Sequence, residues 1–138
     1  MPKKPFQLLP HPADIIIQAQ GKDLSEIFKN CAKGLMAYIF EEKELANQKP
    51  DITEEINLES QDQLGLLIDW LSELLYLSDY HDADFYDYEI LELTAKKIKA
   101  IVYGKKRGAI NDVKAITYHQ SELKKDKDGY LARILCDI

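Results

Sequence analysis

The sequence predicts an α+β domain in which a mostly antiparallel sheet packs around two helices, at about residues 24–40 and 62–79. Three observations support this fold class. Two segments have the apolar periodicity of helices, several others alternate with the two-residue period of strands, and the strands after the second helix follow one another directly. The length of 138 residues favours a single domain over residues 1–138 with a substantial hydrophobic core.

The segment 61–79 predicts the helix around which the rest of the chain is organised. Apolar side chains cover most of its circumference, and polar residues such as Asp62, Asp69 and Glu73 fall into one narrow stripe. A helix that is apolar almost all round is buried almost all round. We therefore expect this helix at the centre of the domain, wrapped by the sheet.

The chain before this helix is expected to begin with an exposed lead-in at 1–12, which four prolines interrupt. Residues 14–21 then alternate as a strand and end in a glycine. Asp23 is a suitable N-cap for the first helix, and Glu26 stands at capping-box spacing from it. The helix at 24–40 follows from these signals and from its apolar spacing.

The remaining strands flank the central helix on both sides. A polar loop at 41–50 leads into an alternating strand at 52–58, and an acidic loop is expected at 78–84 after the helix. A tight hairpin turn is predicted at Gly129, because glycine accepts the positive φ that such a turn needs. Further strand-like runs lie at residues 85–94, 97–103, 113–124 and 130–138.

Composition limits the functional classes. The net charge of −6 argues against broad binding to nucleic acid, which depends on Lys and Arg neutralising phosphates. No apolar run is long enough to span a membrane, and the amino terminus is too short and too rich in proline for a signal peptide. Cys31 and Cys136 lie on apolar faces, which is typical of buried thiols in a reducing cytoplasm.

Carboxylates are the main candidates for chemistry, because the sequence contains no glycine-rich phosphate loop, no nucleophile elbow and no zinc-ligand pair. Asp14 begins the first strand, and Asp137 stands beside the C-terminal carboxylate of Ile138. If the first and last predicted strands are neighbours, these oxygens meet at one sheet end, where a hard cation such as Ca²⁺ or Mg²⁺ finds its preferred ligands. The alternative is two exposed aspartates at strand ends.

Other polar features have both a functional and a structural interpretation. Acidic residues at 79–87 loosely resemble a calcium loop, but they lack the glycine and the glutamate of an EF-hand and suit a solvated connection. The basic residues at 96–107 could steer an anionic partner or form the wet face of a hairpin. Lys114, alone at a strand start, also suits an edge charge that opposes aggregation. Three histidines are interpreted as surface or hydrogen-bonded side chains: His11, His81 and His119.

Five stretches, in the same order along nearly the whole chain, together resemble the archease family. They are HPADI at 11–15, DLSEIFKNCAKGL at 23–35, LLIDWLSELLYLSD at 66–79, VKAITYH at 113–119 and DGYLARILCDI at 128–138. The set is specific, although no single stretch would suffice. Two places depart from the family's pattern: Pro12 stands where threonine is usual, and 105–112 replaces versions that contain His and Glu.

The resemblance implies a protein cofactor and not a stand-alone enzyme. Archeases assist the RtcB-type RNA ligase, which joins tRNA exon halves and repairs RNA, by promoting its metal- and GTP-dependent guanylylation and its repeated turnover. The implied setting is the cytoplasm, with tRNA reached only through the ligase and with no membrane involved. A second role proposed for archeases is that of a chaperone-like specificity modulator of a tRNA-modifying enzyme such as a methyltransferase.

The resemblance also implies site residues. Family members bind a divalent cation, typically Ca²⁺, through aspartates that correspond to Asp14 and Asp137, with the carboxylate of Ile138 as a further ligand. Mg²⁺ and Mn²⁺ are the alternative ions. Three other residues of the same motifs are expected to serve partner contact or activation: Lys114, His11 and His119.

Two further interpretations come from other functional classes. The first is a metal-dependent hydrolase that uses Asp14 and Asp137, which is disfavoured because no candidate nucleophile or general base accompanies them. The second is an α+β domain without activity. Turnover of phosphoester substrates by the protein alone would support the hydrolase over a cofactor protein and over a domain without activity.

Overall fold

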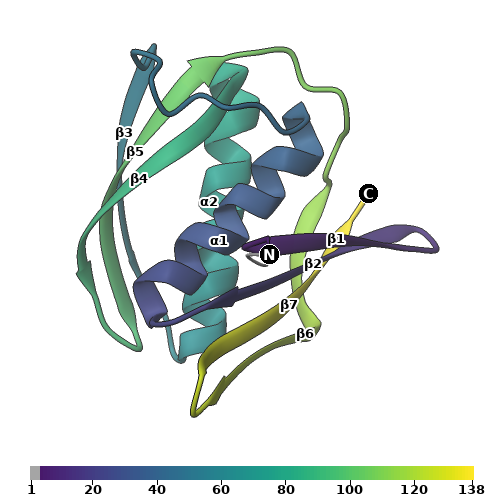
Figure 1. The fold of residues 1–138 in the computed structure, drawn as a ribbon, viewed down its shortest axis with the longest axis vertical. Coiled ribbons are helices and arrows are strands. Elements are labelled where there is room, and N and C mark those ends of the chain that lie inside the picture. The colour runs from purple at the N-terminus through teal and green to yellow at the C-terminus, as the bar shows by residue number, and fades with distance from the viewer. Residues whose placement is uncertain (1–3) are drawn as a thin grey trace.

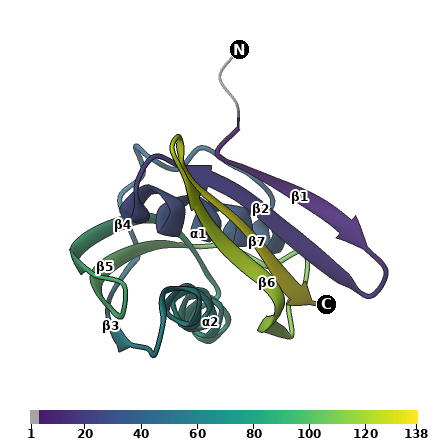
Figure 2. The same cartoon turned by 90° about the horizontal axis from the view of Figure 1, so that it is seen from below.

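Two helices lie between two antiparallel sheets in the computed structural model, which describes residues 4–138 (Figures 1 and 2). One sheet has the strand order β1-β2-β7-β6 and the other β3-β5-β4. The predicted fold class is confirmed, with the expected sheet divided into two. In chain order the elements are β1 Phe6–His11, β2 Asp14–Gly21, α1 Leu24–Phe40, β3 Ile52–Glu59, α2 Gln63–His81, β4 Ala83–Leu93, β5 Lys97–Lys106, β6 Ala115–Asp126 and β7 Gly129–Asp137.

Helix α1 begins and ends at the predicted residues. The carboxylate of Asp23 accepts a hydrogen bond from the backbone N–H of Glu26 at 2.8 Å, and the Glu26 carboxylate accepts one from the N–H of Lys22 at 3.2 Å. The first bond satisfies an N–H group of the first turn that has no helical partner, and the second fixes the residue before the N-cap. The apolar face of α1 is buried at Ile27, Phe28, Cys31, Ala32, Leu35, Met36, Ile39 and Phe40.

Helix α2 is the central helix, as its composition predicts. Trp70, near its middle, is fully buried, and its indole N–H donates to the backbone oxygen of Phe28 in α1 at 3.0 Å. The same indole packs against the rings of Phe28 and of Tyr88 in β4. One side chain therefore joins both helices to the three-stranded sheet. None of the helices in the described part of the chain combines the length and apolar character that crossing a membrane requires.

The predicted lead-in at 1–12 is wrong for the residues that the structure describes. Residues 6–11 form β1, which pairs with β2, and Phe6 is buried in the core. Pro10 is tolerated because β1 is an edge strand, and an edge strand leaves half of its N–H groups unpaired. The part of this prediction that concerns residues 1–3 lies outside the described residues.

The predicted acidic loop at 78–84 is also wrong. Helix α2 continues to His81, β4 begins at Ala83, and Asp82 alone connects them. Asp82 takes the left-handed conformation, with φ 51°, and its N–H caps the helix by donating to the oxygen of Ser78. The acidic residues at 79–87 are therefore divided among the end of α2, its cap Asp82 and the start of β4, and they do not form a calcium loop.

Candidate metal and partner-binding site

Four of the predicted site residues meet at one end of the four-stranded sheet and form what we call the strand-end cluster: His11, Asp14, Lys114 and Asp137. Asp14 stands opposite Asp137 in the β2–β7 pair and opposite His11 in the β1–β2 pair. Ala115, the first residue of β6, also stands opposite Asp137, and the N–H of Lys114 donates to the Asp137 backbone oxygen at 2.7 Å. The first and last predicted strands are thus neighbours, as the metal hypothesis required.

The side chain of Asp14 is mostly buried, with 16% of it exposed. Like charges directly opposite each other destabilise a sheet, so Asp14 and Asp137 are an unfavourable pair when nothing neutralises them. Asp14 Oδ1 lies 2.5 Å from His11 Nδ1, which gives an ion pair when His11 is protonated. The two groups are not oriented as a hydrogen bond, and Oδ1 is the buried side-chain oxygen without a hydrogen-bond partner in residues 4–138.

The oxygen ligands of this site fit a hard divalent cation. A buried carboxylate oxygen without a hydrogen bond is costly unless a cation, a protonated His11 or a water satisfies it. Asp14, Asp137 and the terminal carboxylate of Ile138 supply only oxygen ligands, whereas Ca²⁺ takes about six to eight. Residues 4–138 contain no group of three or more His, Cys, Asp or Glu side chains at metal-binding spacing. The remaining ligands would therefore be waters, backbone carbonyls or groups of a partner.

The cysteines lie outside this chemistry. Burial, with the nearby carboxylates of Asp137 and Asp14, raises the pKa of Cys136 to about 12. Burial also raises the pKa of Cys31. Both residues are therefore neutral thiols at pH 7, and they do not supply the thiolate that binds metal. This burial confirms what the sequence predicts for them.

The loop at 107–114, which leads to Lys114, is anchored by Arg107. The guanidinium donates to the backbone oxygens of Phe40 and Glu41, at 2.7 and 3.1 Å, where α1 ends. It also forms an ion pair with the buried Asp84 at 2.6 Å. Burial raises the pKa of Asp84, and the Arg107 charge and hydrogen bond oppose that rise. The sequence grouped Arg107 with the solvent-facing lysines, and its role was missed.

A second set of bonds fixes the same loop closer to Lys114. The N–H groups of Ile110 and Asn111 donate to the backbone oxygen of Ile39 at 2.8 and 3.2 Å. The Asn111 side chain donates to the oxygen of Tyr38 at 2.9 Å. The last carbonyls of α1 thus find their partners in the loop. The side chain of Lys114 is exposed and forms no ion pair within the described residues.

The structure does not bring His119 to the strand-end cluster. It is exposed and lies in a bulge of β6, beyond the residue pair of Thr117 and Leu135. Gln120, the next residue, has a φ of 63°. His81 is the hydrogen-bonded histidine that one interpretation predicts, since its Nε2 lies 2.7 Å from a carboxylate oxygen of Glu54.

Comparison with known proteins assigns the fold to a family. The model of the archease protein family matches residues 6–138. The chain belongs to the archease family. The protein archease of Methanosarcina barkeri is 35% identical to it over 144 aligned positions, which cover 98% of this chain and 97% of the relative.

Two solved structures share the archease fold with this chain. The solution structure of Methanobacterium thermoautotrophicum protein 1598 aligns with a TM-score of 0.76 at 25% identity, over 99% of this chain and 100% of that one. A crystal structure of a Thermotoga maritima archease, described as a possible chaperone, aligns with a TM-score of 0.62 at 17% identity, over 94% of each chain. The α+β archease fold that the sequence predicts is therefore confirmed.

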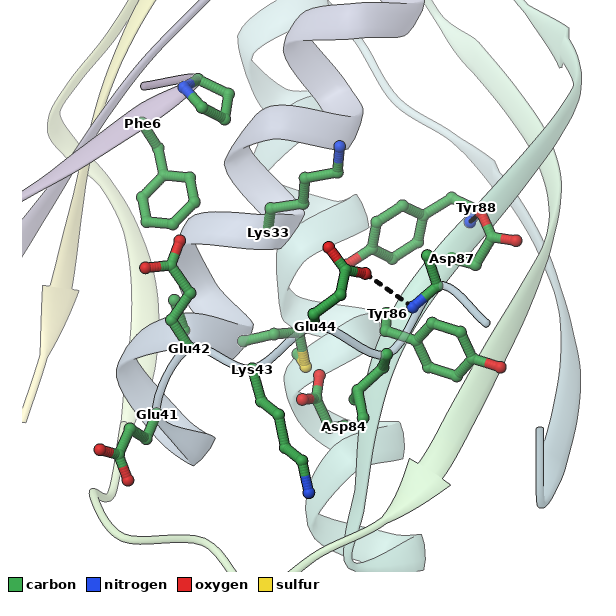
Figure 3. Close-up of a pocket in the computed structure, with 15 residues that line it drawn as sticks. Phe6, Lys33, Glu41, Glu42, Lys43, Glu44, Asp84, Tyr86, Asp87 and Tyr88 are labelled. Carbon is green, nitrogen blue, oxygen red and sulfur yellow. Dashed lines mark hydrogen bonds between the residues drawn. The ribbon is translucent and has the colours of Figure 1, made fainter. Parts of the chain in front are cut away.

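This archease fold also contains a cavity of about 610 Å³, between α1, the segment after it and the start of β4 (Figure 3). Lysines and glutamates are among its lining residues, and one of the glutamates, Glu44, accepts a hydrogen bond from the N–H of Ala46 at 2.8 Å. None of the predicted site residues lines this cavity.

Proposed function

We propose that this protein activates an RtcB-type RNA ligase and promotes its metal- and GTP-dependent guanylylation and repeated turnover in tRNA splicing and RNA repair. Membership of the archease family supports the choice of partner. The observation that carries the proposal is the register of β2 and β7, which sets Asp14 opposite Asp137 at one sheet end. In this role the protein is a cofactor of the ligase and not a stand-alone enzyme.

The strand-end cluster would serve this role through a divalent cation, with Ca²⁺ preferred and Mg²⁺ or Mn²⁺ as alternatives. Asp14, Asp137 and the carboxylate of Ile138 would hold the ion, which supplies positive charge and open coordination positions when bound. His11 flanks Asp14 and restricts its carboxylate. Lys114 offers its free ammonium group to a carboxylate or phosphate of the ligase.

The charge of the protein supports an indirect relation to RNA. A net charge of −6 opposes tight binding to a polyanion, so tRNA would be reached through the ligase. An acidic protein is suited to a basic partner, and a ligase that binds RNA has a basic surface. We place this activity in the cytoplasm, which the two unpaired, buried cysteines support.

The experiment is a multiple-turnover ligation by the cognate ligase with GTP and a divalent metal. Wild type and Asp14→Asn are compared with no added protein, and Asp69→Asn, an exposed residue of α2, serves as the matched control. We expect wild type and the control to increase the number of turnovers and Asp14→Asn to lack this effect. Equal stimulation by wild type and Asp14→Asn would show that the ligase is the partner but that metal binding at Asp14 is not needed for activation.

A second candidate function is a chaperone-like modulator of a tRNA-modifying enzyme such as a methyltransferase. The observation that favours it is the description of the Thermotoga maritima archease as a possible chaperone. Absence of any stimulation of the ligase by wild type would favour this second function. Proteins that co-purify with the full chain would then identify the enzyme.

A further inference from the structure

A groove of about 320 Å³ opens where both helices end, beneath the connection from β5 to β6, which passes over the upper right of Figure 1. Its apolar lining comes from the end of α1, the last turns of α2 and the loop at 107–114. These side chains are Ile39, Phe40, Leu75, Tyr76, Ala109 and Val113. The loop is held in place by its bonds to the last carbonyls of α1, so the groove is built into the fold.

Large apolar side chains are exposed around this groove. Tyr76 lines it and is 58% exposed, and Tyr80, one turn later on α2, is 69% exposed. Their rings are stacked, with centroids 6.0 Å apart. Ile110, between two lining residues of the loop, is 60% exposed. Single exposed hydrophobic residues are ordinary, but three around one groove are typical of an interaction surface.

The polar lining of the groove is acidic. Asp79, Asp82 and Asp112 are exposed and line it, and Lys114 is its one cationic side chain. Both helices point their C-terminal ends toward this region, and a helix C-terminus carries a partial negative charge. The groove therefore combines an apolar floor with a surplus of negative charge.

We propose that this groove docks a basic, arginine-bearing segment of the ligase; the inference rests on the proposed function. A guanidinium group stacks on aromatic rings and pairs with carboxylates in a bidentate way, which suits Tyr76 beside Asp79. An acidic segment or a phosphate would instead meet three carboxylates. A ligase that binds RNA carries basic surface, so the charges of the two partners are complementary.

The position of Lys114 explains why docking here would matter for activation. Lys114 lines the groove, and its backbone N–H donates to the backbone oxygen of Asp137 at 2.7 Å. The groove and the strand-end cluster are therefore joined through one residue. A ligase segment bound in the groove would set Asp14 and Asp137 against the same partner in a defined orientation.

The first test reverses one charge of the groove. In the ligation assay, Asp79→Lys is compared with Asp69→Lys, which places the same change on an exposed residue of α2 outside the groove. Both variants are first shown by circular dichroism to fold. We expect Asp79→Lys to raise the concentration for half-maximal stimulation by about tenfold or more, with stimulation at saturation retained. Asp69→Lys should change it by less than about twofold.

The outcomes separate this inference from the proposed function. If wild type stimulates the ligase and Asp79→Lys does so at the same concentration, the groove is not the docking site and the proposed function stands. If wild type neither binds nor stimulates the ligase, the proposed function and the docking site are both wrong.

The second test identifies the chemistry of the occupant. A photoreactive phenylalanine analogue is placed at Tyr76, the chain is irradiated with purified ligase, and the cross-linked peptide is identified by mass spectrometry. The same analogue at Leu91, an exposed residue of β4, is the control. We expect Tyr76 to capture a ligase peptide that contains arginine. Capture of an acidic segment or of a second copy of this chain would overturn the proposal.

Discussion

Asp14 illustrates how a binding site can oppose the stability of the sheet that forms it. Its carboxylate faces a second aspartate across the β2–β7 pair, and one of its oxygens is buried without a hydrogen bond in the described residues. Both features cost free energy of folding unless a bound cation or a protonated His11 relieves them. A group retained against stability in this way is more readily explained by binding than by packing.

This interpretation predicts the effect of Asp14→Asn on thermal stability. Without metal, in a chelator at pH 7.5, the substitution should raise the melting temperature by about 2 °C, because it removes one of two like charges. Added Ca²⁺ should raise the melting temperature of wild type but not that of the variant, since binding to the folded state alone stabilises it. Thermal unfolding followed by circular dichroism measures both effects. A variant that is as responsive to Ca²⁺ as wild type would contradict the metal assignment.

At the residue scale, the sequence predicts the site as far as strand patterns reach. Asp14 and Asp137 could be expected to meet because each begins or ends an alternating strand. The ion pair of Asp84 with Arg107 could not, since 23 positions separate them and neither alternation nor periodicity couples them. The position of His119 away from the strand-end cluster depends on a bulge in β6, and no turn-forming residue in the sequence indicates that bulge.

At the scale of secondary-structure elements, the loop at 107–114 supplies hydrogen-bond donors to the last carbonyls of α1. Phe40, the last residue of the helix, accepts a hydrogen bond from Arg107, and Ile39 accepts two from the backbone of the loop. Arg107 also neutralises Asp84 at the start of β4. One side chain thus ties the helix end to a strand and orients the segment that leads to Lys114.

We expect Arg107→Ala to destabilise the protein by about 3 kcal/mol at pH 7, because it leaves the Asp84 carboxylate buried and unpaired. Burial already raises the pKa of Asp84 above 3.8, and loss of the arginine should raise it further. A raised pKa means that the folded state binds the proton more tightly, so the loss of stability should shrink as the pH falls toward 4. Urea unfolding of wild type and variant at pH 7 and pH 4 measures the loss of stability at each pH.

The control for this prediction is the double variant Arg107→Ala with Asp84→Asn. Because the second substitution removes the buried charge, the double variant should be more stable at pH 7 than Arg107→Ala alone. A loss of stability that is equal at both pH values would show that Arg107 acts through its bonds to α1 and not through Asp84.

The elements themselves follow from local signals where such signals are strong. Helix α1 has a cap and regular apolar spacing, and its predicted bounds agree with the structure. Strand β1 was missed because the prolines in and around it suggested a lead-in, and only its pairing with β2 makes it a strand. The acidic stretch after α2 suggested a loop by composition, but the left-handed Asp82 lets the chain reverse in one residue.

At the scale of the whole molecule, both sheets and both helices share one core. Trp70 of α2 contacts Phe28 of α1 and Tyr88 of β4, and Cys136 of β7 belongs to the same buried cluster. The division into two sheets could not be read from the sequence, because strand order depends on long-range pairing. Its consequence for function is that β2, which begins at Asp14, and β7, which ends at Asp137, are neighbours in the four-stranded sheet and place both aspartates at the same end of that sheet.

The most direct test of the central claim measures guanylate transfer to the ligase. Purified ligase is supplied with labelled GTP and a divalent metal after one round of ligation, and the label that becomes covalently bound is counted. Wild type should restore labelling, whereas Asp137→Asn and Lys114→Ala should not, and Asp69→Asn should act as wild type. Labelling restored equally by Asp137→Asn and Lys114→Ala would contradict the claim that the strand-end cluster activates the ligase.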